Sequence, residues 1–150
     1  MSTANDPQQM PALSAGVIIV RFKAAAPHYL LLRVFNYWDF PKGMVEENEE
    51  PLAAALREVE EETALQHLVF VWGKEYRQTE PYRTWVAKVA RYYLAESPSG
   101  HVHLPINPEL GRPEHHEFRW LPYEQARPLL SDRVKPILDW ANGLVIKHHN

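Results

Sequence analysis

The hydrophobic and polar positions of the chain predict several strands and one strongly amphipathic helix. β-Branched and aromatic residues are enriched in four stretches that we expect to form strands: 15–22, 28–34, 67–75 and 84–95. Between the second and third stretches, Pro51 begins a run of helix-forming residues that ends at Thr63. This run predicts a helix.

One face of the predicted helix is expected to be buried. Leu52, Leu56, Val59 and Thr63 fall at i, i+4, i+7 and i+11, which is one narrow stripe on a helix surface. We expect this stripe to pack against a sheet.

The remaining segments are assigned by their turn-forming and apolar residues. Residues 97–113 are rich in proline and predict a long loop with a short strand at 101–104, and a loop of this length in a compact domain is usually functional. A last strand is expected at 118–121, followed by helices at 123–130 and 133–147. Residues 1–12 are polar and contain prolines, so we expect a flexible tail before a single domain that covers residues 13–150.

Composition is that of one globular domain. The chain has 150 residues, of which 45% are hydrophobic and 23% charged, and this balance excludes an intrinsically disordered protein. The absence of cysteine excludes disulfides and thiolate chemistry. The apolar runs are too short to cross a bilayer and the first residues lack a signal-peptide pattern, so we expect a cytoplasmic protein without a membrane partner.

The net charge of −3 disfavours a protein that binds long polyanions through a basic surface. We therefore expect no DNA partner. A small anionic substrate held through metal ions is compatible with this charge.

The end of the predicted helix carries a cluster of glutamates. At about 100° per residue, Glu58, Glu61 and Glu62 cover an arc of roughly 100° that points away from the apolar stripe. Like charges at these spacings cost about 0.2–0.5 kcal/mol per pair, and the helix dipole adds a similar cost at this end. A bound divalent cation would remove both costs, since carboxylates are the ligands that Mg²⁺ and Mn²⁺ prefer. The alternative is that these acids form only the solvated face of the helix.

A longer pattern decides between these readings. Gly43, Glu49, Arg57, Glu58, Val59, Glu61, Glu62 and Leu65 match the spacing G-x5-E-x7-R-E-U-x-E-E-x-G-U, in which U is aliphatic. On this pattern the chain is identified as a member of the Nudix hydrolase family. Ala64 stands where the family usually has glycine, a residue that commonly leaves a helix in the left-handed conformation, so alanine predicts strain or an altered helix exit.

The flanking sequences extend the resemblance. YLLLRV, YWDFPKG and EHHEFRWLPYEQARPLL are similar to segments of Nudix enzymes that act on dinucleoside polyphosphates. The resemblance implies an α/β/α sandwich with a mixed β-sheet between helices. It also implies metal-dependent hydrolysis of a nucleoside diphosphate linked to another group, with diadenosine tetraphosphate cleaved to ATP and AMP as the preferred expectation.

The resemblance also assigns roles to residues. Glu58, Glu61 and Glu62 are the implied ligands of Mg²⁺ or Mn²⁺, together with the backbone carbonyl of Lys42. Glu114 is implied to approach the metals and act as general base, with Glu117 as the alternative. Arg57 and Glu49 are implied to orient the motif.

Substrate contacts are weaker expectations. Lys42 and Lys88 are candidates to hold the polyphosphate, the alternative being that each is simply solvent-exposed. Tyr76, Tyr82 and Tyr92 are candidates to stack on a base, although an aromatic residue in a strand is more often part of the core.

Trp38 is interpreted as a packing residue. His101, His103, His115 and His116 match no usual zinc spacing, but His115 or His116 could contact a substrate phosphate.

Two other functions compete with this hypothesis. One is removal of pyrophosphate from RNA 5′ ends or from nucleoside triphosphates, where the net charge slightly disfavours RNA. The other is a non-catalytic nucleotide-binding module. The sequence leaves the oligomeric state open.

Overall fold

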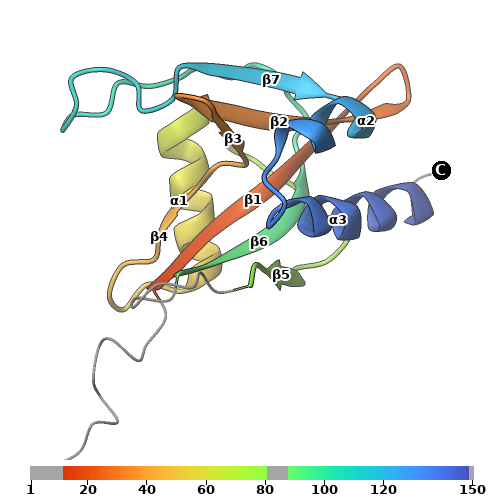
Figure 1. The fold of residues 1–150 in the computed structure, drawn as a ribbon, viewed down its shortest axis with the longest axis horizontal. Helices are drawn as coiled ribbons and strands as arrows, with labels where there is room; N and C mark the ends of the chain where they lie inside the picture. The colour runs from red at the N-terminus through yellow and green to blue at the C-terminus, as the bar shows by residue number, and fades with distance from the viewer. Residues whose placement is uncertain (1–11, 81–87, 149–150) are drawn as a thin grey trace, which may run out of the picture.

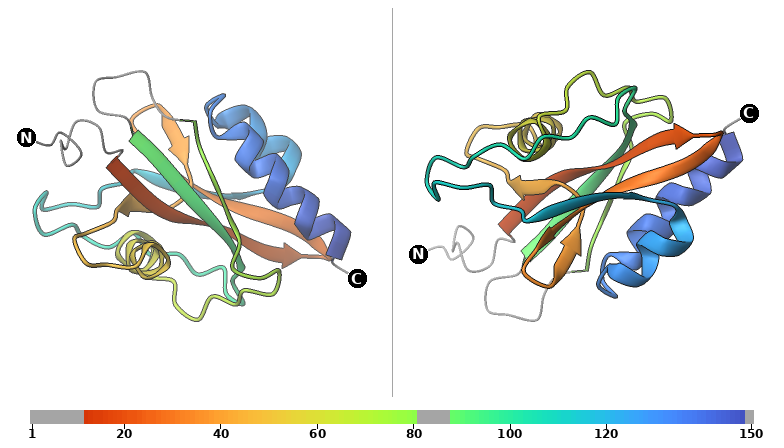
Figure 2. Two further views of the ribbon diagram at one scale, coloured as in Figure 1. Left: turned by 90° about the horizontal axis from the view of Figure 1, so that it is seen from below. Right: turned by 90° about the horizontal axis from the view of Figure 1, so that it is seen from above.

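A mixed β-sheet lies between helices in the computed structural model of the protein, which describes residues 12–80 and 88–148 (Figure 1). In chain order the elements are β1 (Ala12–Lys23), β2 (Ala26–Val34), β3 (Tyr37–Asp39), β4 (Lys42–Met44), α1 (Pro51–Thr63), β5 (Tyr76–Gln78), β6 (Lys88–Glu96), β7 (Glu117–Leu121), α2 (Tyr123–Ala126), the 3₁₀ helix η2 (Arg127–Leu129) and α3 (Lys135–His148). The expected α/β/α sandwich is confirmed, with α1 on one face of the sheet and α3 on the other (Figure 2).

The seven-stranded sheet is built around β1. Its main order is β3-β2-β1-β6-β5, with β4 paired to β1 and β7 paired to β2. β1 and β6 are parallel, and the other pairs are antiparallel. Segment 41–42 lies directly against Gly16, where a Cβ atom would overlap the backbone of Pro41 and Lys42. Gly16 therefore lets the motif loop dock on the central strand.

Alternate residues of the central strand supply two separate cores, as the two-residue period of a strand requires. Ile18 and Val20 face α3 and pack with Leu138 and other buried residues. Val17 and Ile19 face α1 and pack with Val59 and its neighbours. Residues 15–20 of β1 are buried on both faces, so this strand forms the centre of the sandwich.

Several predicted elements are confirmed with shifted ends. The strands expected at 15–22, 28–34 and 118–121 correspond to β1, β2 and β7, and the helix ending at Thr63 is α1. The strand expected at 84–95 corresponds to β6 in its described part, because residues 81–87 lie outside the described residues. Of the tail expected at 1–12, only Ala12 is described, and it is the first residue of β1.

The strand predicted at 67–75 is wrong. Only Val69 forms a bridge there, with Glu96, and the strand of this region is β5, which begins at Tyr76. His67 has a φ of 63° and Gly73 a φ of 96°, so the backbone turns at both ends of the segment. Leu68 and Phe70 of this segment pack against the α1-side core, and Trp72 packs against the α3-side core.

Three further predictions need correction. Residues 101–104 form no strand, because the His103 N–H donates to the carbonyl of Thr63 at the end of α1. The helix predicted at 123–130 divides into α2 and η2, since Pro128 cannot continue the α-helical hydrogen bonds. Between β2 and α1, where no strand was predicted, the chain forms two short strands, β3 and β4.

Leu56 was wrongly assigned to the buried stripe of α1. Its exposed fraction is 37%, whereas Ala54, Ala55, Val59 and Thr63 are buried. Small alanine side chains let the helix backbone approach the sheet closely, so the buried face is rotated away from Leu56. Within the described residues, no helix is long and apolar enough to cross a membrane.

Candidate active site

Arg57 organises the acidic end of α1. Its Nε and Nη2 atoms donate to the two oxygens of Glu49, at 2.8 and 3.0 Å. Its Nη1 atom donates to Glu58 at 3.0 Å and to Glu61 at 3.2 Å, and Nη2 also reaches the backbone carbonyl of Met44 at 3.0 Å. Since one guanidinium group ties the loop to three carboxylates of the motif, Arg57 and Glu49 have the geometry that an orienting pair requires.

Glu58 is held against the motif loop at Gly43. A Cβ atom at Gly43 would overlap the Glu58 carboxylate, and the side chain of Glu58 is only 14% exposed. A glycine at this position therefore makes the space in which the carboxylate lies.

Glu62 is the most buried acid of the cluster. Its exposed fraction is 7%, and one carboxylate oxygen accepts a 3.3 Å hydrogen bond from the backbone N–H of Lys42. Burial raises the pKa of Glu62 well above its usual range, and a side-chain hydrogen bond with Glu58 and the charge of Glu114 act in the same direction. The raised pKa favours the protonated form of Glu62 in the absence of a bound cation.

The prediction that all three acids point away from the buried face is therefore wrong. The side chain of Glu61 is 56% exposed, but those of Glu58 and Glu62 lie between α1 and the motif loop. The closeness of the helix to β4, which the alanine residues permit, turns an outer acidic face into a partly buried one.

A cavity of about 720 Å³ opens over these carboxylates. One side is acidic and the other is formed by the loop that joins β6 to β7. The lining comprises Glu46, Arg57, Glu58, Glu60, Glu61, Glu62, Leu104, Pro105, Ile106, Asn107, Pro108, Glu109, Pro113, Glu114 and His115. The volume lies within the usual range for small-molecule sites.

The structure brings most of the predicted motif residues to this cavity. Glu58, Glu61, Glu62 and Arg57 line it together with Glu114, which comes from a segment more than fifty residues away along the chain. Glu117, the alternative base, instead pairs with Arg33 and Arg119, which lower its pKa.

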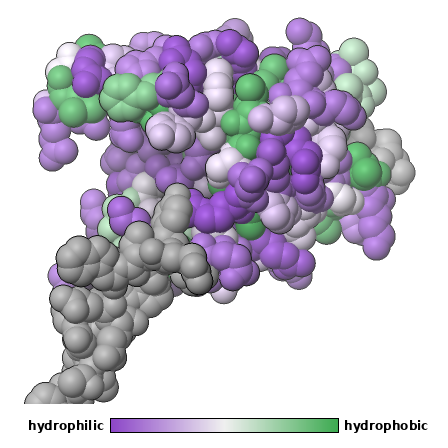
Figure 3. Space-filling model, viewed as in Figure 1, coloured by the Kyte–Doolittle hydropathy of each residue, from purple (hydrophilic) through white to green (hydrophobic). Residues whose placement is uncertain are grey.

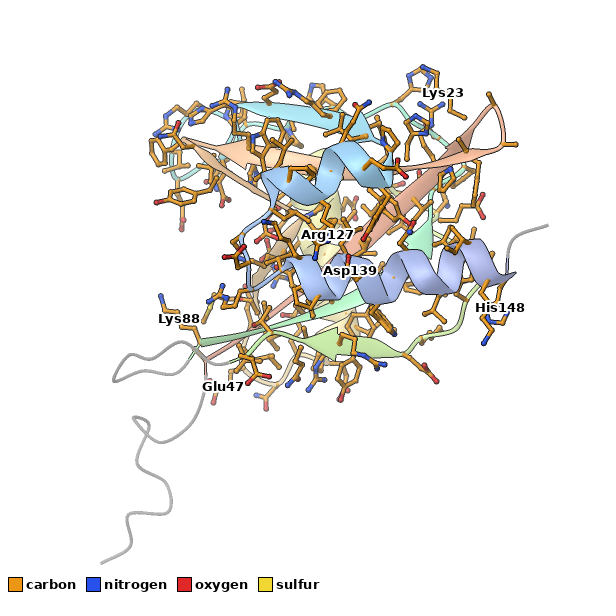
Figure 4. All side chains as sticks on the ribbon, turned by 45° about the vertical axis from the view of Figure 1, so that its right-hand side comes forward. Lys23, Glu47, Lys88, Arg127, Asp139 and His148 are labelled. Carbon is orange, nitrogen blue, oxygen red and sulfur yellow. The ribbon has the colours of Figure 1, made fainter. Side chains whose placement is uncertain are left out.

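The predicted substrate contacts are more dispersed. Lys42 lies beside the cluster, with its Nζ atom 3.6 Å from a carboxylate oxygen of Asp39. Lys88 begins β6 at the edge of the described residues (Figure 4), and neither it nor Tyr76 is part of the cavity lining. The ring of Tyr76 contacts the guanidinium of Arg91, 4.0 Å from the ring centroid. Tyr82 lies outside the described residues.

Tyr92 cannot stack on a base, contrary to the prediction, because it is fully buried. Its hydroxyl donates to Asp39 at 2.9 Å, and burial is the main cause that raises the pKa of both groups. Trp38 packs against the α3-side core, as expected, and the guanidinium of Arg119 lies 4.7 Å from its ring centroid.

Sequence reasoning gave too little weight to His115 and to residues 104–108. The Nε2 atom of His115 is 3.9 Å from Glu62, and burial lowers the pKa of the imidazole, which favours its neutral form. Residues 104–108 carry no chemical motif, and only the folded loop shows that they face the acids. The sequence feature that could have indicated a functional role for these residues was the length of the loop that contains them.

Ala64 ends α1 in the left-handed conformation that glycine usually adopts. Its φ and ψ angles are 64° and 8°, and its N–H donates to the carbonyl of Glu60 at 2.9 Å. The backbone therefore leaves the helix in the conformation that is usual with glycine, and the presence of alanine at this position strains the backbone of Ala64.

The donors at this site fit a divalent cation. Glu58 and Glu62 offer hard carboxylate oxygen atoms beside neighbouring positions of the motif loop, Gly43 and Lys42, and such atoms suit Mg²⁺ or Mn²⁺. In residues 12–80 and 88–148, no three Asp, Glu or His side chains are arranged around one metal position. The carboxylates of Glu58 and Glu61 both accept hydrogen bonds from Arg57, which holds them beside the guanidinium.

Comparisons with known proteins identify the family. A family model described as the NUDIX domain matches residues 10–141. The asymmetrical bis(5′-nucleosyl)-tetraphosphatase of Sus scrofa is 32% identical over 129 residues, which are 78% of this chain and 83% of that protein. The RNA pyrophosphohydrolase of Bartonella henselae is 39% identical over 44 residues, 29% of this chain and 25% of that protein.

Solved structures agree with the fold. A crystal structure of a C. elegans Ap4A hydrolase binary complex matches with a TM-score of 0.75 and 22% identity, covering 91% of this chain and 98% of that one. Together with the family model and the relative from Sus scrofa, this likeness shows that the chain belongs to the Nudix family and is a Nudix pyrophosphohydrolase.

Proposed function

We propose that this Nudix hydrolase cleaves dinucleoside tetraphosphates asymmetrically, with diadenosine tetraphosphate giving ATP and AMP. The choice of substrate rests on the similarity to the asymmetrical tetraphosphatase of Sus scrofa, which extends over most of both chains. The observation that carries the chemistry is the placement of Glu58, Glu61, Glu62 and Glu114 around one cavity, which is lined by seven glutamates and one arginine.

This lining is too negative to bind a polyphosphate unaided, which supports a requirement for divalent cations, Mg²⁺ or Mn²⁺. Glu58 and Glu62 would hold the first of them, and Glu61, Glu114 and the carbonyl of Lys42 would complete the ligand set. When bound, such cations offset the charge of the phosphate oxygens and make water more acidic.

The roles of the protein's own groups follow from their positions. Glu114 would accept a proton from the attacking water, because it faces Glu62 across the cavity and comes from a separate segment. Arg57 and Glu49 would hold the helix end in register with the motif loop. The Lys42 ammonium would approach the polyphosphate after leaving Asp39, and Lys88, Tyr76 and Tyr82 are proposed as outer contacts of the substrate.

Product analysis tests this proposal. The protein is incubated with diadenosine tetraphosphate and Mg²⁺ or Mn²⁺, and the products are separated by anion-exchange chromatography. We expect ATP and AMP in equal amounts, and a rate at least about a hundredfold lower for Glu58→Gln, since the variant loses a charged ligand. Glu47→Gln is the matched control, because Glu47 is exposed and outside the cavity lining (Figure 4).

A second candidate is removal of pyrophosphate from RNA 5′ ends or from nucleoside triphosphates. It is favoured by the 44-residue similarity to the RNA pyrophosphohydrolase of Bartonella henselae. Release of orthophosphate or pyrophosphate from a triphosphate substrate, with diadenosine tetraphosphate left intact, would establish it and overturn the first proposal. Nucleotide binding without turnover across several metals would instead indicate a non-catalytic module.

A further inference from the structure

The two walls of the cavity differ in chemistry. One wall is the end of α1, with the carboxylates of Glu58, Glu61 and Glu62. Facing it is a short apolar segment that contains Pro105, Ile106 and Pro108 and is part of the loop between β6 and β7. We infer that this segment, hereafter the 104–108 wall, binds a nucleobase of the substrate. The inference rests on the proposed function, since it assigns a subsite within the same cavity.

Ile106 is the residue that points to a ligand. Its exposed fraction is 67%, although it lies in the lining of a cavity and is flanked closely by two prolines. A large aliphatic side chain contributes nothing to the core in this position. It offers an apolar surface to whatever occupies the cavity.

The wall is fixed relative to the acidic helix. At one end of the loop, the His103 N–H donates to the carbonyl of Thr63 at 3.0 Å, which ties the loop to the last turn of α1. Val102 and Leu104 pack against the α1-side core, and Figure 2 shows the loop running beside α1. These contacts therefore fix the position of the apolar surface relative to the carboxylates.

The other end of the wall is closed by a compact turn. The N–H of Asn107 donates to the carbonyl of Arg112 at 2.9 Å, and the carbonyl of Asn107 accepts from Leu110 and Gly111. The side chain of Asn107 also accepts from the N–H of Glu109 at 2.8 Å. A surface prepared in this way binds with little loss of conformational entropy.

Charge decides which part of a nucleotide meets this wall. The phosphates require the cations held by Glu58 and Glu62, whereas the base is flat and uncharged and gains most from an apolar surface. Since Glu46, Glu60 and Glu109 complete most of the remaining lining, the 104–108 wall is the part of the cavity best suited to a base. Such a contact depends on the apolar face of the base and not on its hydrogen-bonding groups. We therefore expect tighter binding of nucleotides than of polyphosphates without a base, and little discrimination among the bases.

Calorimetric titration with two probes tests the inference. ATP and inorganic tripolyphosphate are titrated, each with Mg²⁺, into the unaltered protein, Ile106→Ala and Leu110→Ala. We expect Ile106→Ala to weaken ATP binding about tenfold and to leave tripolyphosphate within twofold, because only ATP carries a base. Leu110→Ala is the matched control, since Leu110 lies in the same loop, is 47% exposed and is outside the cavity lining. Ile106→Leu should retain the affinity for ATP.

The kinetic counterpart is a raised KM for diadenosine tetraphosphate in Ile106→Ala with kcat nearly unchanged. An equal effect of Ile106→Ala on both probes, no effect on ATP, or equal affinity of the unaltered protein for both probes would overturn the inference. The titrations need no turnover. If diadenosine tetraphosphate is not cleaved but Ile106→Ala selectively weakens ATP, the proposed substrate is wrong and the base subsite is retained.

Discussion

On the α3 side of the sheet, Arg127 binds Asp139 with two hydrogen bonds of 2.9 and 3.0 Å, and Tyr123 donates to the same carboxylate (Figure 4). On the α1 side, Arg57 is bonded to Glu49, Glu58 and Glu61. Both clusters join segments that are separate in the fold. They differ in the balance of charge. In the first cluster one guanidinium is hydrogen-bonded to one carboxylate, whereas in the second cluster one guanidinium is hydrogen-bonded to three carboxylates.

This difference separates a structural cluster from a functional one. The charge of Asp139 is matched within the cluster, and the α3 side presents a largely hydrophilic surface with small separate hydrophobic groups (Figure 3). Around Arg57 an excess of carboxylate remains, and it is partly buried at Glu58 and Glu62. Burying carboxylates without enough counter-charge is costly, as the raised pKa of Glu62 shows, and such groups are often found where a protein binds a cation.

The largest difference between the two clusters is expected when the arginine of each is replaced. Arg57→Ala should lower kcat/KM at least about a hundredfold, since three carboxylates lose the group that orients them. Arg127→Ala should leave kcat/KM within about twofold and lower the melting temperature slightly. Steady-state kinetics and thermal unfolding of both variants measure this. A comparable loss of activity in the two variants would contradict the assignment of separate roles.

A smaller effect is expected from adding one methyl group beside the carboxylates. In Gly43→Ala the new Cβ atom would displace the Glu58 carboxylate, and we expect kcat/KM to fall about tenfold with the fold intact. Circular dichroism and steady-state kinetics measure the two consequences.

Gly143 supplies the matched control. It lies in α3, and nothing is within 4 Å of a Cβ atom placed there. Gly143→Ala should leave kcat/KM unchanged and stabilise the protein by up to about 1 kcal/mol. Unchanged kinetics in Gly43→Ala would show that the loop does not position Glu58.

Relief of strain at the end of α1 should be measurable as stability. Ala64→Gly is expected to raise the free energy of unfolding by about 1 kcal/mol, because the residue has a φ of 64°. Urea denaturation measures it. Ala53→Gly, at an exposed position inside the same helix, should lower that free energy by about the same amount. Destabilisation in both variants would mean that Ala64 is not strained.

The smallest effect concerns pH and the α3-side cluster. Hydrogen bonds from Arg127 and Tyr123 lower the pKa of Asp139, so its contribution to stability is present above the unfolded pKa, about 3.9, and is lost as pH falls through the lower folded pKa. At neutral pH, Asp139→Asn should cost only about 0.5 kcal/mol, because both ionic partners are roughly 40% exposed and solvent screens them.

Urea denaturation of Asp139→Asn and the unaltered protein at pH 7 and near pH 2.5 follows this loss. The difference in unfolding free energy should be smaller at the lower pH. Asp132→Asn is the control, because the Asp132 side chain is 98% exposed. A difference of the same size at pH 7 and pH 2.5 would show that the effect comes from packing and not from charge.

Local patterns predicted some parts of this molecule well and others poorly. The run from Pro51 to Thr63 predicted α1 to within a residue, because proline and helix-forming side chains act within one turn. The stretch 67–75 has similar local information for a strand, yet it turns at His67 and Gly73 and packs against the core. Backbone pairing partners lie far along the chain, and their position is not encoded in the local composition.

The sequence by itself determined the family motif, the helix that ends at Thr63 and the strands at 15–22 and 28–34, since each follows from residue types and spacing within a short segment, and the family resemblance implied the sandwich. Only the tertiary structure decided that Glu62 is buried, that His115 lies beside it, and that Ile106 lines the same cavity as the acids. These relations depend on how closely α1 approaches the sheet and where the loop after β6 is anchored. Both are set by side-chain packing between segments distant in sequence.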